Sequence, residues 1–97
     1  MVKARLLYHQ KFVFADGAIQ EMRLWQLPEA TSERLHGLKY SLHYRSADGT
    51  GLVRYDNEAG KGDHRHRGTL EEPYHFSTVE KLVADFLADV DRARGGE

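Results

Sequence analysis

The sequence predicts an α+β fold, in which an antiparallel sheet of four to five strands carries one C-terminal helix packed on one face. Two Asp-Gly dipeptides lie between apolar segments, and this dipeptide is typical of tight hairpin turns. Residues 38–45 alternate strictly between apolar and polar side chains, which indicates a half-buried strand. Near the end of the chain, apolar residues recur at helical spacing, and they can be buried by packing against that strand.

Composition bounds the class of protein. A chain of 97 residues has room for one core, so residues 1–97 are expected to form a single domain. The chain has no cysteine, which excludes disulfides and thiolate zinc sites and is in keeping with a reducing compartment. The first residues lack the apolar run of a signal peptide, and no segment approaches the roughly 20 apolar residues of a membrane span. We therefore expect a cytoplasmic protein without a membrane partner.

Charge is distributed unevenly along the chain, although the net charge is only -1. Residues 1–68 contain 11 Lys and Arg against 8 Asp and Glu, whereas residues 69–97 contain 3 against 7. The sequence thus combines a basic body with an acidic C-terminal part.

Two hairpins account for the first half of the chain. Residues 5–14 and 19–27 are expected to be strands joined by the first Asp-Gly turn. In the second of these strands, Met22 and Leu24 point to one side while Ile19 and Trp25 point to the other. This pattern predicts either cover on both faces or a bulge that re-aims the strand. Residues 38–45 and 51–55 should form the second hairpin, after a loop at residues 28–37.

The segment 56–73 is polar and contains three glycines, and the sequence predicts a long loop there, followed by a short strand at residues 69–76. Loops of this length in compact domains are mostly functional or disordered. The C-terminal helix is expected to begin at a capping box of Ser77 and Glu80 and to end near residues 92–94, before two glycines.

The residues with the chemistry for a reaction are concentrated at positions 54–67. Cleavage of RNA without a metal requires a base for the 2′-hydroxyl, an acid for the leaving oxygen and cations for the phosphate. Histidine suits either proton-transfer role near neutral pH, and Asp56 or Asp63 could orient a histidine. The predicted catalytic residues are His64, His66, Lys61 and Asp56, and the predicted substrate-binding residues are Arg65, Arg67, Tyr55 and Arg54.

Other interpretations of this segment compete. Asp63, His64 and His66 could bind a divalent metal ion, but Arg65 and Arg67 would repel it, so the leading interpretation has no metal and no cofactor. The spacing of a Walker A loop is absent, which argues against nucleotide hydrolysis. A charged loop that is only solvated is the plainest alternative. His43 lies on the polar side of its strand, where it either faces water or extends a basic surface.

The chain resembles the TumE family of bacterial toxins over nearly its whole length. The most specific part of the resemblance is YDNEAGKGDHRH at residues 55–66; further parts are ADGAIQEMRLWQLPE, HGLKYSLHY, EEPYHF and LVADFLADV. The resemblance implies a toxin encoded beside an antitoxin, which would be its protein partner. By analogy, many small toxins are ribonucleases.

The leading hypothesis is therefore a toxin that cleaves RNA as a metal-independent endoribonuclease. Two alternatives remain open: a non-catalytic module that binds RNA, DNA or protein through the basic segment, and a metal-dependent nuclease. An acidic segment of the antitoxin could cover the basic body and block the site.

Overall fold

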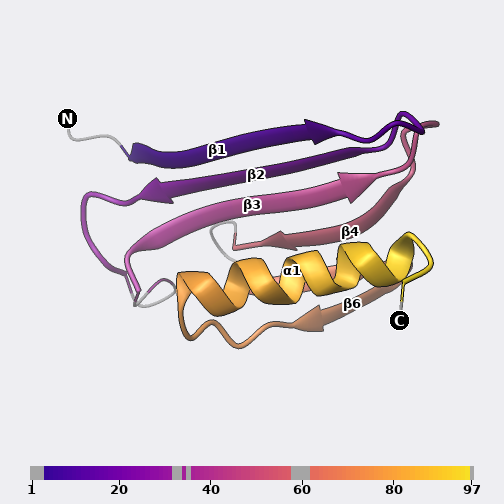
Figure 1. Ribbon diagram of the computed structural model, residues 1–97. Helices are drawn as coiled ribbons and strands as arrows, with labels where there is room; N and C mark the ends of the chain where they lie inside the picture. The colour runs from indigo at the N-terminus through magenta and orange to yellow at the C-terminus, as the bar shows by residue number, and fades with distance from the viewer. Residues whose placement is uncertain (1–3, 32–33, 35, 58–61, 97) are drawn as a thin grey trace.

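The protein is a six-stranded antiparallel sheet with one helix against it (Figure 1). The computed structural model describes residues 4–31, 34, 36–57 and 62–96. The elements in chain order are β1 (Arg5–Val13), β2 (Ile19–Gln26), β3 (Leu38–Arg45), β4 (Gly51–Asp56), β5 (His64–Arg67), β6 (Leu70–Pro73) and α1 (Val79–Ala93).

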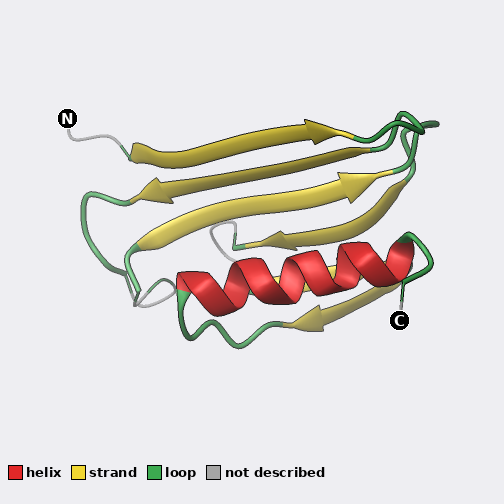
Figure 2. Ribbon diagram, viewed as in Figure 1, coloured by secondary structure: helices red, strands yellow, loops and turns green. Residues whose placement is uncertain are grey.

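The sheet is a simple meander, because the strand order is β1-β2-β3-β4-β5-β6 and every neighbouring pair is antiparallel. Helix α1 lies along one side of this sheet, and no described helix or strand covers the other side (Figure 2). We call the first side the helix face and the second the open face. The predicted α+β class and the packing of the C-terminal helix are confirmed, with one strand more than expected.

The core lies between α1 and the helix face. Tyr40 and Leu42 of β3 are buried there as the alternation predicted, and Phe86 of α1 is 0% exposed. The ring of Tyr55, from β4, meets Phe86 edge to face at 5.8 Å between ring centroids. The other buried apolar residues are Ala18, Met22, Tyr44, Val53, Tyr74, Leu82 and Val90.

Both Asp-Gly turns form as predicted. In the first, Gly17 has a φ of 89°, a left-handed conformation that favours glycine, and the carboxylate of Asp16 accepts a hydrogen bond from the Ala18 amide. In the second, Asp48 accepts equivalently from Thr50. These hydrogen bonds fix the register of the two hairpins and therefore decide which side chains share a face.

The ambiguity in the second strand is resolved by burial on both faces and not by a bulge in that strand. A register shift lies in β1 between Leu6 and Tyr8, whereas β2 pairs with β3 without interruption. The middle of β2 is covered on both faces, since Glu21 on the open face and Met22 on the helix face are both buried.

The loop predicted at residues 56–73 is wrong over much of its length, whereas the short strand predicted at residues 69–76 is confirmed as β6 (Leu70–Pro73). Asp56 belongs to β4, and β5 and β6 form a third hairpin at residues 64–73. The sequence hid β5 because its four residues, His64–Arg67, are all polar, so no apolar alternation marks a strand. Each side of β5 is instead occupied by ion pairs.

The start of α1 is also corrected. The N-cap is Thr78, whose hydroxyl accepts from the Lys81 amide at 3.1 Å, and Ser77 precedes it. The helix begins at Val79, so the third helical amide belongs to Lys81, and Thr78 stands where a side chain can reach it. The end at Ala93 agrees with the prediction. Among the described residues, no helix has the length and apolarity needed to cross a membrane.

Candidate functional site

The strand β5 divides the predicted site between the two faces of the sheet. Successive strand residues point to opposite faces, so His64 and His66 share one face and Arg65 and Arg67 the other. The register pairs Arg65 with Tyr55, which lies in the core under α1. The two arginines therefore lie on the helix face, and the two histidines lie on the open face.

Arg65 and Arg67 are held by carboxylates on the helix face. Arg65 donates from Nε and Arg67 from Nη2 to the same Oε1 of Glu72, at 2.7 and 2.6 Å. Both guanidinium groups also lie within 4 Å of the buried carboxylate of Asp89 in α1. These contacts join β5, β6 and the helix. Carboxylates of the protein thus pair with the two arginines that were predicted from the sequence to bind substrate.

Tyr55 is likewise a core residue. Its side chain is fully buried, and its hydroxyl donates to Asp89 and accepts from Arg65. Burial and the hydrogen bond to Asp89 raise the pKa of Tyr55 to about 12. On this geometry Tyr55 supports the Arg65 and Asp89 network from beneath the helix, away from the open face.

On the open face, Asp56 and His64 form a buried pair. Their Cα atoms are partners in the register, and Nε2 of His64 lies 2.7 Å from Oδ1 of Asp56. Among the described residues, no donor is aligned well enough to hydrogen-bond that oxygen, so the contact is an ion pair when His64 is protonated. The other ring nitrogen, Nδ1, lies 3.0 Å from the carbonyl oxygen of Gly62. Both nitrogens of His64 thus face oxygen atoms, and its orientation is fixed.

Arg54 and His66 lie beside the Asp56 and His64 pair and are more exposed than it. The two residues are register partners on β4 and β5, and their side chains are 54% and 33% exposed. Nε of Arg54 lies 2.7 Å from Oδ2 of Asp56, which ties the guanidinium to the Asp56 and His64 pair. Nδ1 of His66 lies 3.7 Å from the exposed carboxylate of Glu71 on β6.

His43 extends the same row of residues, and sequence reasoning undervalued it. The register places His43 on β3 directly beside Arg54, so that His43, Arg54 and His66 follow one another across three strands. Burial lowers the pKa of His43 below its ordinary value, although the nearby carboxylate of Glu21 opposes this shift. Nε2 of His43 lies 3.3 Å from that carboxylate. The sequence feature that could have indicated this place is the alternation of residues 38–45, which puts His43 on the polar side of the strand.

Glu21 is the buried anion of this face. One of its oxygens accepts from His9 at 2.7 Å and from Arg23 at 3.0 Å. The hydrogen bond from His9, with the charges of Arg23 and His43, holds the pKa of Glu21 below its ordinary value. His9 is therefore paired with a buried carboxylate.

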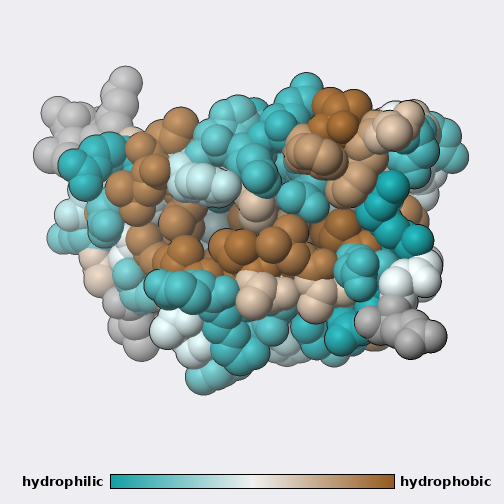
Figure 3. Space-filling model, viewed as in Figure 1, coloured by the Kyte–Doolittle hydropathy of each residue, from teal (hydrophilic) through white to brown (hydrophobic). Residues whose placement is uncertain are grey.

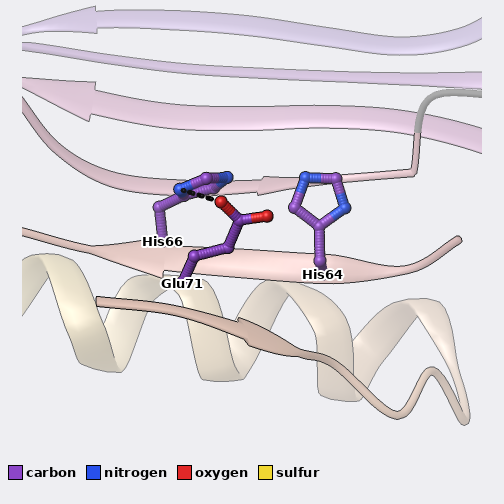
Figure 4. Close-up of side chains that lie close together, drawn as sticks. All are labelled: His64, His66 and Glu71. Carbon is purple, nitrogen blue, oxygen red and sulfur yellow. Dashed lines mark ion pairs between the residues drawn. The ribbon is translucent and has the colours of Figure 1, made fainter. Parts of the chain in front are cut away.

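The carboxylate of Asp63 is engaged by residues other than the two histidines of β5. Its carboxylate accepts from the Tyr40 hydroxyl at 2.7 Å, and Nε2 of His36 lies 3.1 Å away. The metal set of Asp63, His64 and His66 is therefore not the one that comes together. The cluster that forms is His64, His66 and Glu71, whose possible ligand atoms all lie within 4.8 Å of one another (Figure 4). The predicted catalytic residue Lys61 lies outside the described residues.

Two recesses flank the row of open-face residues. One has a volume of about 370 Å³ and is lined by His43, Arg45 and Arg54 together with Ser41, Tyr44, Gly49, Gly51 and Val53. The other has a volume of about 390 Å³ and is lined by Asp63, His64, Glu71, Glu72 and Pro73. His43 and Arg54 thus border a concave surface that can accept part of a ligand.

Among the described strand residues, cations outnumber anions on the open face. Strand alternation places Lys11, Arg23, Lys39, Arg45 and Arg54 there, against Glu21, Asp56 and Glu71. Trp25 also lies on this face, only partly buried, with the Lys39 ammonium 5.1 Å from its ring centroid. The open face therefore combines positive charge with an accessible aromatic ring.

The helix face carries a different kind of depression. A groove of about 330 Å³ runs between α1 and the first strands, and it is lined by Leu7, Tyr8, Met22, Leu24, Leu42, Val79, Leu82 and Val83. Apolar side chains gather beside the helix in the space-filling view (Figure 3). This surface offers mainly apolar contact.

Comparison with known proteins assigns a family. The family model described as "Toxin TumE" matches residues 3–94, which is nearly the whole chain. Neither the comparison with curated proteins nor that with solved structures finds a significant match.

Proposed function

Because this chain belongs to the TumE toxin family, we propose that it is the toxin of a toxin–antitoxin pair and that it acts as a metal-independent endoribonuclease through its open face. The single observation that carries the proposal is the row of His43, Arg54 and His66, which lie in register on β3, β4 and β5. Two imidazoles thereby flank one guanidinium.

The reaction needs two proton carriers and one cation. A base removes the proton from a ribose 2′-hydroxyl, the 2′-oxygen attacks the adjacent phosphorus, and the 5′-oxygen of the next nucleotide leaves with a proton from the acid. The products are a 2′,3′-cyclic phosphate and a 5′-hydroxyl end. Water is not consumed, and the charge that grows on the phosphoryl oxygens is stabilised by a cation.

The spacing of the row suits a phosphate between the two imidazoles. Residues in register two strands apart have Cα atoms roughly 10 Å apart, because neighbouring strands are separated by about 4.8 Å. His43 and His66 point to the same side of the sheet, so their rings can approach opposite sides of a phosphate held by Arg54. Arg54 also lines a recess with His43.

We assign the base to His43 and the acid to His66. The lowered pKa of His43 favours the neutral imidazole, which is the form that accepts a proton. Glu21, 3.3 Å from Nε2 of His43, orients the ring and leaves Nδ1 for the substrate. His66 pairs with the Glu71 carboxylate when it is protonated, and it is exposed enough to meet a leaving oxygen.

His64 and Asp56 take a positioning role in this scheme. His64 is buried, and both of its ring nitrogens face oxygen atoms, so it is poorly placed to exchange protons with a substrate. Asp56 holds the guanidinium of Arg54 through Oδ2 and contacts His64 through Oδ1. The role predicted for Lys61 stays a prediction.

Cleavage of RNA in EDTA tests the proposal. Purified protein is incubated with end-labelled RNA, and the products are checked for 2′,3′-cyclic phosphate ends. His66→Gln should lower the rate by roughly 10²- to 10⁴-fold. His75→Gln, which changes an exposed histidine outside the row, should cleave like the wild type. No cleavage by the wild type, or equal cleavage by His66→Gln, would refute the assignment.

A non-catalytic RNA-binding module is the second candidate, and the surplus of cations with Trp25 and Lys39 on the open face favours it. Such a module predicts that affinity falls steeply with salt, with roughly one counterion released per phosphate contacted. The same RNA would be recovered intact, which separates this function from the first.

Membership of a toxin family implies an antitoxin partner. We place an acidic segment of that partner on the open face, where cations outnumber anions and where it would cover Arg54 and His66. Co-expression followed by pull-down should recover a complex, and Arg23→Glu with Arg45→Glu should weaken it. A complex of unchanged affinity would place the antitoxin elsewhere on the molecule.

A further inference from the structure

We propose that His64, His66 and Glu71 form a zinc site, and that Zn²⁺ bound there inhibits the toxin by occupying His66. The three side chains come from the β5–β6 hairpin and lie on one side of it (Figure 4). Two imidazoles and a carboxylate, in a chain without cysteine, are the donors of an open zinc site, which leaves the fourth position for water.

His64 is already oriented as a metal ligand. Its Nδ1 lies 3.0 Å from the Gly62 carbonyl oxygen and can donate a proton there, so Nε2, which lies 2.7 Å from Oδ1 of Asp56, is the atom that would bind zinc after releasing its proton. Ligating histidines in proteins usually donate their second ring nitrogen to a carbonyl or carboxylate in this way, which fixes the tautomer and the ring.

The charges around the cluster favour a cation. Oδ1 of Asp56 lies 2.7 Å from Nε2 of His64, is buried, and has no well-aligned hydrogen-bond donor among the described residues. Zn²⁺ bound at Nε2 would replace the proton there, and the negative charge of Asp56 beside it would favour the metal ion. Glu71 adds a second negative charge, against the positive charge of Arg54, which is paired to Asp56.

The main objection from the sequence does not hold in the fold. Arg65 and Arg67 were expected to repel a metal ion because they alternate with the histidines. They point instead to the helix face, where Glu72 and Asp89 neutralise them. The sheet separates those cations from the cluster.

The cluster needs only a small contraction to bind zinc. Tetrahedral ligands at about 2.0–2.1 Å from zinc lie roughly 3.4 Å apart, whereas the possible ligand atoms here lie within 4.8 Å. The Glu71 side chain is 57% exposed and His66 is 33% exposed, so both can rotate towards the fixed ring of His64. The consequence for activity rests on the proposed function, because His66 is the acid there.

Binding is tested with the full chain and ZnCl₂ alone by titration calorimetry, and with Co²⁺ by the visible absorption of tetrahedral cobalt. Wild type should bind one Zn²⁺. Glu71→Gln should weaken binding by at least about tenfold, because even the loss of a residue that only hydrogen-bonds a metal ligand typically lowers metal affinity by that factor. His43→Gln, which changes a histidine on the same face outside the cluster, should leave affinity unchanged. No binding, or equal affinity of wild type and Glu71→Gln, would overturn the site.

Inhibition is tested by adding Zn²⁺ to the RNA cleavage reaction without EDTA. We expect wild-type cleavage to fall over the concentrations at which Zn²⁺ binds, and Glu71→Gln to require at least about tenfold more metal. Stimulation by Zn²⁺ would overturn inhibition and support metal-dependent hydrolysis instead. If wild type cleaves no RNA under any condition, the proposed function and the inhibition both fail, and the calorimetric titration alone decides the site.

Discussion

The two faces of β5 differ in how their side chains are engaged, although their residues alternate within a stretch of four. Arg65 and Arg67, on the helix face, are paired with Glu72 and Asp89 and connect the hairpin to α1. On the open face, His64 is held by Asp56 and the Gly62 carbonyl, whereas His66 is partly exposed and its Nδ1 lies 3.7 Å from the Glu71 carboxylate. Successive residues of a strand point to opposite faces and can therefore have different roles. A cluster of reactive residue types in the sequence does not by itself form one site.

The two faces of the whole sheet differ in the same way. The helix face buries aromatic and aliphatic side chains against α1, and the open face carries a polar row that crosses the strands. We infer that stability resides mainly on the helix face and chemistry on the open face. Substitutions on the two faces should then affect different measurements.

The largest effect on stability is expected at Phe86, which is 0% exposed in the core. Phe86→Ala should lower the free energy of unfolding by about 3–5 kcal/mol, because it leaves a cavity and removes buried apolar area. His66→Ala on the open face should change it by no more than about 0.5 kcal/mol. Urea unfolding followed by circular dichroism measures both, and similar losses for the two variants would break the comparison.

The acidic limb of the pH profile sharpens the assignment of the base. Burial lowers the pKa of His43 from its ordinary 6.5, so the neutral base persists to lower pH, and the midpoint of the acidic limb of kcat/KM should lie below pH 6.5. Glu21 opposes that shift, so Glu21→Gln should lower the pKa of His43 further and move the limb to still lower pH. A limb above pH 6.5, or one unmoved by Glu21→Gln, would argue against His43.

Much of the fold could be predicted because local signals were strong. The Asp-Gly turns, the alternation of residues 38–45 and the apolar stripe of the last helix each have one dominant physical cause. The strand β5 was missed because its residues are all polar, so its place in the sheet depends on partners distant in sequence, such as Asp89.

The residues of the candidate site that are close in sequence could be predicted to come together, and those that are distant in sequence could not. His64 and Asp56 are register partners and come together, as do Arg54 and His66. Sequence spacing does not reveal that His43, more than ten residues earlier, becomes the neighbour of Arg54, or that Glu71 joins the histidines from β6. Both follow only from the order and register of the strands.

The smallest effect on stability is expected at the N-cap of α1, and it tests the corrected start of that helix. Thr78→Ala should lower the free energy of unfolding by about 1 kcal/mol, because the Lys81 amide loses its acceptor. Ser77→Ala should change it by less than about 0.5 kcal/mol. A larger loss at Ser77 than at Thr78 in the same unfolding experiment would restore the capping box predicted from the sequence.

Growth arrest on induction of the toxin, compared for two adjacent residues of β5, tests the central claim most directly. His66→Gln should abolish growth arrest while the folded protein accumulates at the wild-type level. Arg67→Gln should retain growth arrest, with a lower melting temperature, because it weakens the contacts to Glu72 and Asp89. Growth arrest that survives His66→Gln, but is lost in a folded Arg67→Gln protein, would contradict the division between the two faces.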